Sequence, residues 1–194
     1  MSKTLKPWII LLVILICGLP ACNSMEPPST AKSPVSSAPP TSLPMPPPSG
    51  SSLTTLGWTA DGGKRTVFSE YKGKVLVLDF YATWCEPCRR SIPHLIGLQN
   101  QYADQGLQVI GLNVGGEGDE DKVPAFAKEF GIEYPLASPD DELVTFLLGN
   151  NDAIPQTFVF DRQGLLSERL IGYGPNAGAR LDRAVEAALQ TPAP

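Results

Sequence analysis

The chain has 194 residues, of which 42% are hydrophobic and 18% charged, a composition typical of an ordinary soluble domain. Its 20 prolines and 18 glycines exceed average usage and indicate one domain joined to a proline-rich segment. A formal net charge of -5 argues against nucleic acid or an acidic membrane surface as a partner, and four cysteines at positions 17, 22, 85 and 88 are too few and too uneven for a disulfide-stapled scaffold.

The sequence pattern at residues 1–21 predicts a secretory signal. Two lysines precede an apolar run of 12 residues at positions 8–19, whereas a helix that crosses a bilayer needs ~20. The Leu-Pro-Ala-Cys segment at positions 19–22 resembles the lipobox of bacterial lipoproteins, in which a small residue precedes a cysteine that receives diacylglycerol. We therefore expect export and a lipid anchor on Cys22. An uncleaved anchor, or a plain signal cleaved near Ala21, stays open, and either would also export the domain.

Residues 22–52 predict the lipid attachment point and a linker. Of the 25 residues from 26 to 50, nine are Pro and six are Ser, and only two are charged, so this segment cannot build a core. Proline-rich chain favours the extended polyproline II conformation, which is suited to a spacer. A proline-motif ligand is the rival interpretation, and it is less consistent because no basic residue flanks the prolines in the usual way.

Residues 53–190 predict one domain in which strands alternate with helices. Strands are expected at 53–58 and 64–68 around Asp61-Gly62-Gly63, at 75–80, at 107–114, and at 156–161 and 165–173 around a turn at 162–164. Helices are expected at 86–103, at 120–130 closed by Gly131, at 140–148 and at 177–189. The run at 75–80 is apolar except for Asp79, as expected for a strand buried on both faces. This order predicts an α/β sheet with helices on both faces.

Trp84-Cys85-Glu86-Pro87-Cys88 lies where a predicted strand ends and a predicted helix begins. Free backbone amides and the helix dipole favour an anion at that position, so Cys85 is expected to react as a thiolate nucleophile. With two residues between the thiols, Cys88 lies one helical turn along and is close enough to attack a mixed disulfide formed at Cys85. Cys88 is therefore the expected resolving thiol.

Other uses of this cysteine pair fit less well. A zinc site usually needs four ligands, and outside the signal the chain adds only His94 and Cys22 to the pair; covalent haem attachment needs His directly after the second Cys, where this chain has Arg89. A purely structural disulfide stays open, although so short a ring stabilises little by loop closure. Neither a metal nor a dissociable cofactor is expected.

The run from Asp79 to Cys88, Asp-Phe-Tyr-Ala-Thr-Trp-Cys-Glu-Pro-Cys, resembles the active site of the thioredoxin superfamily. Pro93 falls where these proteins kink their first long helix, and the segment from Ile154 to Asp161 is similar to the one that opens with their cis-proline. The resemblance implies a cis Pro155 that faces Cys85 and leaves the adjacent backbone free to pair with an extended substrate. An ordinary proline at the start of a strand is the alternative. Trp84, Glu86, Pro87 and Ile154 would support the site.

Within the superfamily, the N-terminal hairpin, Gly73-Lys74-Val75, the lipoprotein-like start and an insertion at 120–148 resemble the TlpA/ResA branch. This resemblance implies the thioredoxin fold with that hairpin and insertion. It also implies an extracytoplasmic thiol:disulfide oxidoreductase, monomeric, acting on protein thiols and disulfides and recharged by a membrane electron donor. Several members of the branch are reductants in cytochrome c maturation.

Two positions depart from that branch. Its members usually carry Glu three residues after the second Cys and an amide or apolar residue six before the first, whereas this chain has Ser91 and Asp79. Asp79 sits where thioredoxins keep a buried carboxylate, and burial is expected to raise its pKa so that it relays a proton to or from Cys88. A solvated Asp at the end of a strand is the alternative. These departures place the cytochrome-specific pocket of the branch in question.

Glu86 gives the chemistry an expected direction. A negative charge beside the thiols disfavours the thiolate and favours a reducing couple, although a first-turn acid also stabilises a helix. We therefore expect a reductase, with an oxidase or isomerase as the alternative, and a non-catalytic binding module as a second alternative. A peroxidase fits less well, because peroxiredoxins place Thr three residues before the reactive Cys and this chain has Ala82. The only histidine, His94, is expected on a helix surface.

Overall fold

The sheet of the domain is built around strand β3 (Val75–Tyr81), whose side chains are all buried. The structure, a computed structural model, describes residues 52–60 and 62–194, so the predicted signal at 1–21, Cys22 and almost all of the linker at 22–52 lie outside the described residues. The described residues all belong to one compact unit. Among them, no helix is both long and apolar enough to cross a bilayer.

Seven strands form one mixed sheet in the order β2-β1-β5-β4-β3-β6-β7. β3 pairs in parallel with β4, β4 in parallel with β5, and the remaining neighbours are antiparallel. The other strands are β1 (Gly57–Ala60), β2 (Arg65–Val67), β4 (Leu107–Asn113), β5 (Leu136–Pro139), β6 (Gln156–Phe160) and β7 (Leu166–Ile171). Because β3 and β4 run in parallel, the loops that follow them leave the sheet at the same edge.

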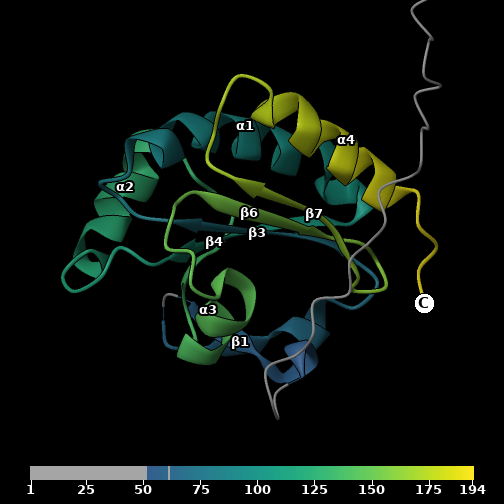
Figure 1. Ribbon diagram of the computed structural model, residues 1–194, viewed down its shortest axis with the longest axis horizontal. Helices are drawn as coiled ribbons and strands as arrows, with labels where there is room; N and C mark the ends of the chain where they lie inside the picture. Colours follow the sequence, from purple (N-terminus) through teal and green to yellow (C-terminus); the bar gives the residue numbers. More distant parts are fainter. Residues whose placement is uncertain (1–51, 61) are drawn as a thin grey trace, which may run out of the picture. The chain divides into compact units, whose positions relative to one another are not determined.

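Four α-helices cover the sheet: α1 (Glu86–Tyr102), α2 (Val123–Phe130), α3 (Asp141–Leu148) and α4 (Ala177–Leu189). Figure 1 shows α1 and α4 on one side of the sheet and α3 on the other. Short 3₁₀ turns lie at Leu53–Thr55, Phe68–Tyr71, Ala103–Gln105 and Glu120–Lys122. The described domain is therefore a three-layer α/β structure, as the alternation of strands and helices predicts.

Side chains that alternate along β3 divide the interior into two cores. Val75, Val77 and Tyr81 join the core formed with α1, α2 and α4. Leu76, Leu78 and Phe80 join a second core with α3 and the N-terminal hairpin. Successive side chains of a strand point to opposite faces, so Asp79 shares its face with Val77 and Tyr81 and points into the α1 layer.

The predicted strand at 53–58 is wrong in its first half. Leu53–Thr55 forms a 3₁₀ turn, in which the Thr55 backbone and hydroxyl both donate to the carbonyl of Ser52, at 3.0 and 2.9 Å. This local bonding competes with strand pairing, so β1 begins only at Gly57. A Cβ at Gly57 would lie 2.1 Å from the Thr66 carbonyl oxygen, so the close approach of β1 and β2 requires glycine there. Likewise, Phe68 belongs to a 3₁₀ turn and not to β2.

Two more elements differ from the prediction. β5 was not predicted from the sequence, because a four-residue segment that ends in proline carries little strand signal. The helix predicted from residue 120 begins as a 3₁₀ turn and becomes α-helical only at Val123. The predictions of α1, α3 and α4 are confirmed to within a residue, and Gly131 ends α2 in the left-handed conformation at φ 65°.

Candidate active site

Cys85 and Cys88 form a disulfide at the start of α1, with their Cα atoms 5.3 Å apart. Cys85 is the N-cap residue of the helix, and its Sγ accepts a hydrogen bond of 3.2 Å from the Cys88 backbone N–H. Cys88 has no exposed surface, whereas Cys85 keeps 4%. The sulfur of Cys85 is thus the one that solvent reaches, and the helix amides are positioned to stabilise it as an anion.

The residues around the disulfide lie at the surface end of α1. The Trp84 side chain is 63% exposed, and its indole Nε1–H donates to the Gly115 carbonyl over 3.2 Å. Glu86 is solvated and lies 3.7 Å from Arg90 one turn along the helix. Pro87 occupies the first turn of α1, where a missing N–H costs no helical hydrogen bond. An exposed aromatic therefore stands next to Cys85, and the Glu86 charge faces water.

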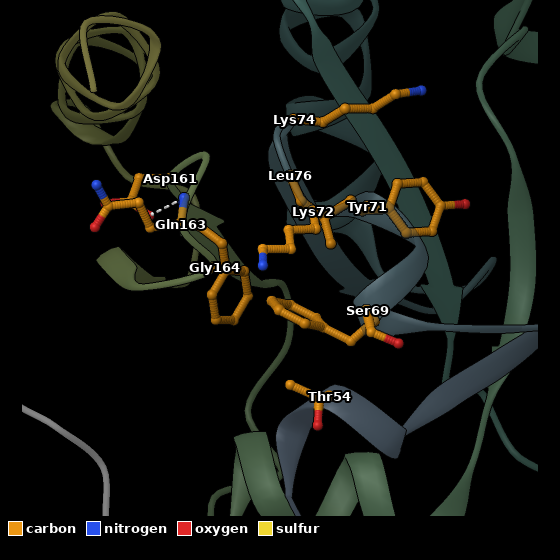
Figure 2. A pocket seen from close by; sticks show the side chains of 11 residues that line it. Thr54, Ser69, Tyr71, Lys72, Lys74, Leu76, Asp161, Gln163 and Gly164 are labelled. Atoms are coloured by element: carbon orange, nitrogen blue, oxygen red, sulfur yellow. Dashed lines mark hydrogen bonds between the residues drawn. The ribbon is translucent and has the colours of Figure 1, made fainter. Parts of the chain in front are cut away.

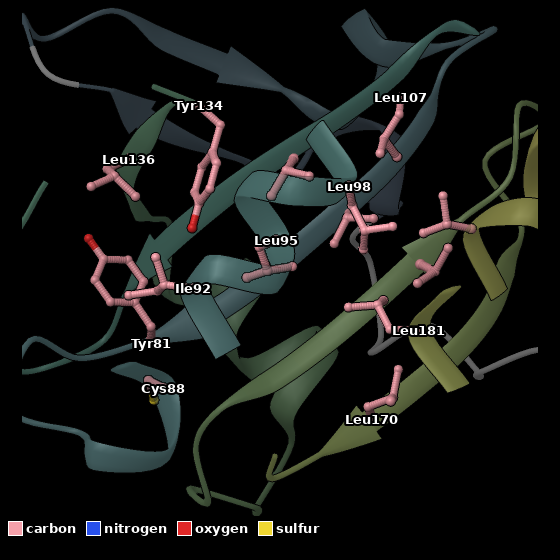
Figure 3. Close-up of a cluster of buried hydrophobic side chains, with 14 of the residues drawn as sticks. Tyr81, Cys88, Ile92, Leu95, Leu98, Leu107, Tyr134, Leu136, Leu170 and Leu181 are labelled. Atoms are coloured by element: carbon pink, nitrogen blue, oxygen red, sulfur yellow. The ribbon is translucent and has the colours of Figure 1, made fainter. Parts of the chain in front are cut away.

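Asp79 is a buried carboxyl group in the layer between the sheet and α1. It is only 2% exposed, and the Thr157 hydroxyl donates to its Oδ1 over 2.6 Å. Burial raises its pKa to about 7, although the bond from Thr157 opposes that rise. Burial and the charge of Asp79 also raise the pKa of Tyr134. Figure 3 shows Tyr134, Tyr81 and Cys88 in this same buried cluster.

The peptide bond between Ile154 and Pro155 is cis, as the resemblance implies. Pro155 directly precedes β6, and the antiparallel register that pairs Asp79 with Thr157 and Phe80 with Gln156 brings it to the edge where β3 ends. Its carbonyl accepts a hydrogen bond of 2.7 Å from Gly172. Ile154 is partly buried against the α1-side core. That Pro155 faces Cys85 and forms a substrate groove stays a prediction.

Asp119 belongs to the site and was not predicted from the sequence. It is 1% exposed, and its Oδ2 accepts hydrogen bonds from the Thr83 backbone N–H at 3.0 Å and from Asn113 Nδ2 at 2.9 Å. Its Oδ1 accepts from the Thr83 hydroxyl and lies 3.7 Å from Lys122. Burial raises the pKa of Asp119, but the hydrogen bonds from Thr83 and Asn113 outweigh it and hold the pKa below its ordinary value.

The strand order is the feature from which the contacts of Asp119 could have been predicted. Asn113 ends β4 and Thr83 follows β3, and parallel neighbours bring their carboxyl ends to one edge of the sheet. The glycine-rich segment after β4 adds to it, because a Cβ at Gly115 would lie 1.9 Å from Asp119 Oδ2. Pairing β3 with β4 is thus enough to bring residues 113–119 against the loop that carries Cys85.

Ser91 and Arg89 fill the space beside the cysteines on α1. The buried Ser91 hydroxyl donates to the Cys88 carbonyl over 2.8 Å, so it caps a backbone group of α1 and does not supply a carboxyl. Arg89 forms an ion pair with Glu129, and its guanidinium lies 4.8 Å from the centre of the Phe130 ring. Arg89 therefore joins the first turn of α1 to α2.

His94 is less exposed than the sequence suggests. Its Nε2 lies 2.8 Å from Asp182 Oδ1 of α4, and its side chain is 26% exposed. It therefore joins two helices and is not a free surface residue. Among residues 52–60 and 62–194, no group of three or more His, Cys, Asp or Glu is placed to hold a metal ion.

A separate cavity of about 250 Å³ lies near the amino end of β3. Its lining includes Phe68, Leu76 and Phe160, with Lys72 and Gly164 at its sides, as Figure 2 shows. Cys85 follows the opposite, carboxyl end of β3, and neither cysteine lines this cavity. The cysteine site and the cavity are thus two distinct features of the domain.

Known proteins of the same family match most of the chain. The sequence pattern of the AhpC/TSA family matches residues 38–169. The chain belongs to the AhpC/TSA family. Within it, the thiol-disulfide oxidoreductase ResA of Geobacillus thermodenitrificans is 32% identical over 112 residues, which cover 57% of this chain and 62% of that protein. The chain thus matches less than two thirds of the length of this relative.

Solved structures support the same fold. A Chlorobium tepidum protein described as a DsbE-type thiol:disulfide interchange protein is 26% identical, with a TM-score of 0.62, and the match covers 74% of this chain and 99% of that one. A second thiol:disulfide interchange protein of the thioredoxin family from Chlorobium tepidum is 32% identical, with a TM-score of 0.58 over 72% of this chain and 98% of that one. This AhpC/TSA family member therefore has the thioredoxin fold expected from its sequence.

Proposed function

We propose that this protein is a thiol:disulfide oxidoreductase that reduces disulfides in protein substrates. The observation that carries the proposal is the Cys85–Cys88 disulfide at the start of α1, with the Cys88 N–H directed at the Cys85 sulfur. The names of the ResA and interchange-protein relatives point to the same chemistry. Since one fold hosts many activities, it is the geometry of the cysteines that supports this reaction.

The structure represents the oxidised end state of the proposed cycle. After reduction, the Cys85 thiolate attacks one sulfur of a substrate disulfide, forming a mixed disulfide and releasing the other substrate sulfur as a thiolate, which takes up a proton. Cys88 then attacks the Cys85 sulfur, restores the internal disulfide and releases the second substrate thiol. Two electrons pass from the dithiol to the substrate, and a membrane electron donor returns them.

Asp79 is the proposed proton relay for the second step. Cys88 has no exposed surface, so its thiol proton needs an acceptor inside the protein. Asp79 points into the layer that contains Cys88, and burial raises its pKa to about 7, so near neutral pH the carboxyl both accepts and returns a proton. Pro155, at the same edge of the sheet, is the proposed floor of the substrate groove.

The direction of electron flow is proposed from the charge of Glu86. Its carboxylate lies in the first turn of α1, 3.7 Å from Arg90. A negative charge at this position disfavours the Cys85 thiolate and so favours a reducing couple, although solvent weakens the effect. Reduction is thus the proposed direction, and the measured potential separates it from oxidation or isomerisation.

We further propose that the protein is exported and held by lipid on Cys22, with residues 23–52 as the spacer before a domain at 53–190. Support comes from the signal-like start and the Leu-Pro-Ala-Cys segment at 19–22. A role in cytochrome c maturation is proposed from the resemblance to the TlpA/ResA branch, and the protein is proposed to act as a monomer. Mass spectrometry of the protein recovered from membranes checks the anchor, since diacylglycerol on Cys22 adds a defined mass.

The first experiment is the equilibrium reduction potential of the Cys85/Cys88 couple in the full chain, titrated against glutathione and dithiothreitol buffers. A value near or below that of thioredoxin, about -270 mV, supports a reductase. A value near -120 mV contradicts that direction and makes the protein a disulfide donor. Peptide mass spectrometry keeps the readout on Cys85 and Cys88 and away from Cys17 and Cys22.

A matched pair of variants tests the roles of the two thiols. We expect Cys88→Ser to accumulate a mixed disulfide with a reducible protein such as insulin, because the resolving thiol is gone. Cys85→Ser is expected to accumulate none and to lose reduction of insulin. If Cys85→Ser loses insulin reduction but keeps full biological activity in the cell, the domain acts as a binding module and not as a reductase.

A further inference from the structure

The loop that carries Cys85 is held by the segment that follows β4. Thr83 donates both its backbone N–H and its hydroxyl to Asp119, and Trp84 donates its indole N–H to the Gly115 carbonyl. The two residues directly before Cys85 are therefore both bound to residues 115–119. The Cys85 N–H adds a turn bond of 3.2 Å to Ala82, so little freedom remains between β3 and the sulfur.

Asp119 is the centre of this contact. Its two oxygens receive three hydrogen bonds from Thr83 and Asn113, and the carboxylate is 1% exposed. Gly115 leaves no space for a side chain at that point, since a Cβ would lie 1.9 Å from Asp119 Oδ2. Hydrogen bonds from this many donors hold a buried carboxylate in one position and favour its ionised form.

We propose that Asp119 is a positioning residue that fixes the Cys85 loop and, through its buried negative charge, limits how much of Cys85 is thiolate. This inference rests on the proposed function and deepens it, since it assigns a determinant of the redox couple outside the Cys-Glu-Pro-Cys motif. Asp119 acts through its hydrogen bonds to Thr83 and through its charge, and it does not itself exchange electrons or protons with the substrate.

The charge of Asp119 is expected to act over a longer range than that of Glu86. Coulomb interactions weaken in proportion to the effective dielectric, which is lower for a buried group than for a solvated one. Glu86 is exposed, whereas the Asp119 carboxylate is almost fully buried and lies 3.7 Å from the exposed Lys122. Charged side chains near the Cys85 loop also include Arg90, which pairs with Glu86, and Arg89, which donates to the Thr83 carbonyl over 3.4 Å and pairs with Glu129. The buried anion therefore disfavours the thiolate and keeps the couple reducing.

The decisive variant is Asp119→Asn in the full chain. The asparagine side chain has the same shape, its oxygen accepts from the Thr83 N–H and Asn113, and its amide donates to the Thr83 hydroxyl oxygen, so position is kept while charge is lost. We expect the equilibrium with glutathione to shift about tenfold toward the reduced form, equivalent to ~30 mV. The pH profile of Cys85 alkylation by iodoacetamide, followed on its peptide, is expected to move to lower pH.

Asp121→Asn is the matched control, because it removes the same charge two residues away at an exposed position. We expect it to change both readouts by less than twofold. If Asp119→Asn melts like the wild type and also leaves both readouts within twofold, Asp119 has only a structural role and the inference is wrong.

A second variant keeps the inference testable if Asp119→Asn does not fold. Thr83→Val removes one hydrogen bond from the Asp119 carboxylate and leaves every charge in place. A donor then no longer offsets part of the negative charge on Asp119, so that charge acts more strongly on Cys85. We expect Cys85 alkylation at pH 7 to slow two- to fivefold, opposite in sign to Asp119→Asn, and an unchanged rate overturns the inference. Alkylation needs no substrate protein, so failure of insulin reduction in the wild type counts against the proposed function alone.

Discussion

At the scale of single residues, the site depends on two buried aspartates whose environments have opposite effects. Asp79 has one hydrogen-bond donor, Thr157, and burial raises its pKa to about 7. Asp119 has three bonds from Thr83 and Asn113, which hold its pKa below the ordinary value. The number of donors thus decides which carboxyl exchanges a proton near neutral pH and which stays charged.

We predict that Asp79→Asn removes a pH dependence of stability. The native state holds the Asp79 proton up to about pH 7, whereas the unfolded chain releases it near 3.8, so the free energy of unfolding falls as the pH rises through this window. The full fall is about 4 kcal/mol. Urea denaturation at pH 5 and pH 8 measures about 3 kcal/mol of this fall, the part that lies above pH 5. The variant is expected to be more stable than the wild type at pH 8.

The same substitution is expected to slow insulin reduction about a hundredfold at pH 7, because general acid–base catalysis contributes at least that much. Asp141→Asn is the control, since Asp141 is exposed in the first turn of α3. Equal pH dependence of stability in the wild type and in Asp79→Asn would contradict the role of burial, and an unchanged rate would remove Asp79 from the mechanism.

At the scale of elements, the glycine that ends α2 is a feature that the sequence predicts directly. Gly131 ends α2 with φ 65°, a conformation in which a side chain is strained. We predict that Gly131→Ala lowers the free energy of unfolding by about 1 kcal/mol. Gly97 is the control, because it lies exposed inside α1 with open space around it, and Gly97→Ala is expected to raise stability by up to about 1 kcal/mol. A urea titration that gives both changes the same sign would contradict this assignment.

Long apolar or periodic segments carry most of the predictable structure. The strand at Val75, the helices that begin at Glu86 and Ala177 and the cis bond before Pro155 follow from composition and motif. β5 and the 3₁₀ turn at Leu53–Thr55 do not, because β5 is defined by its neighbours and the turn by a local bond to Ser52. The secondary structure of such short segments is set by the strands or residues they bond to, and less by the propensities of their own residues.

The same limit applies to the site. Cys85, Cys88 and Asp79 stand on consecutive elements within ten residues, so a local motif brings them together. Asp119 lies 36 residues after Thr83, and their contact exists only because β3 and β4 pair in parallel. Contacts of this kind need the strand order before they can be predicted.

At the scale of the whole molecule, Arg162 connects segments that are distant in sequence. Its guanidinium donates to the carbonyls of Gly73 at 3.1 Å, Gln105 at 2.7 Å and Leu189 at 3.4 Å. These carbonyls lie before β3, after α1 and at the end of α4. The turn between β6 and β7 thus binds the segment before β3, the segment after α1 and the end of α4. All of these contacts lie at the end of the sheet away from the cysteines.

We predict that Arg162→Lys lowers the free energy of unfolding by about 1 to 3 kcal/mol, because an ammonium cannot reproduce the fixed fork of donors. Arg183→Lys on the exposed side of α4 is the control and is expected to change it by less than about 0.5 kcal/mol. Chemical denaturation measures both. The reduction potential is expected to be the same in both variants, and a shift in Arg162→Lys would mean that this end of the sheet influences the thiols.

The alternation of side chains along β3 gives the sheet one side that contains the redox-active cysteines and another that is lined by apolar side chains. Changes of charge and oxidation state take place on the α1 side, whereas Leu76, Leu78 and Phe80 present only hydrocarbon and aromatic surface to the α3 side. The sheet therefore separates substitutions in α3 and the N-terminal hairpin from the thiols. The surface of the α3 side can therefore change in composition while the α1 side keeps the same electron chemistry.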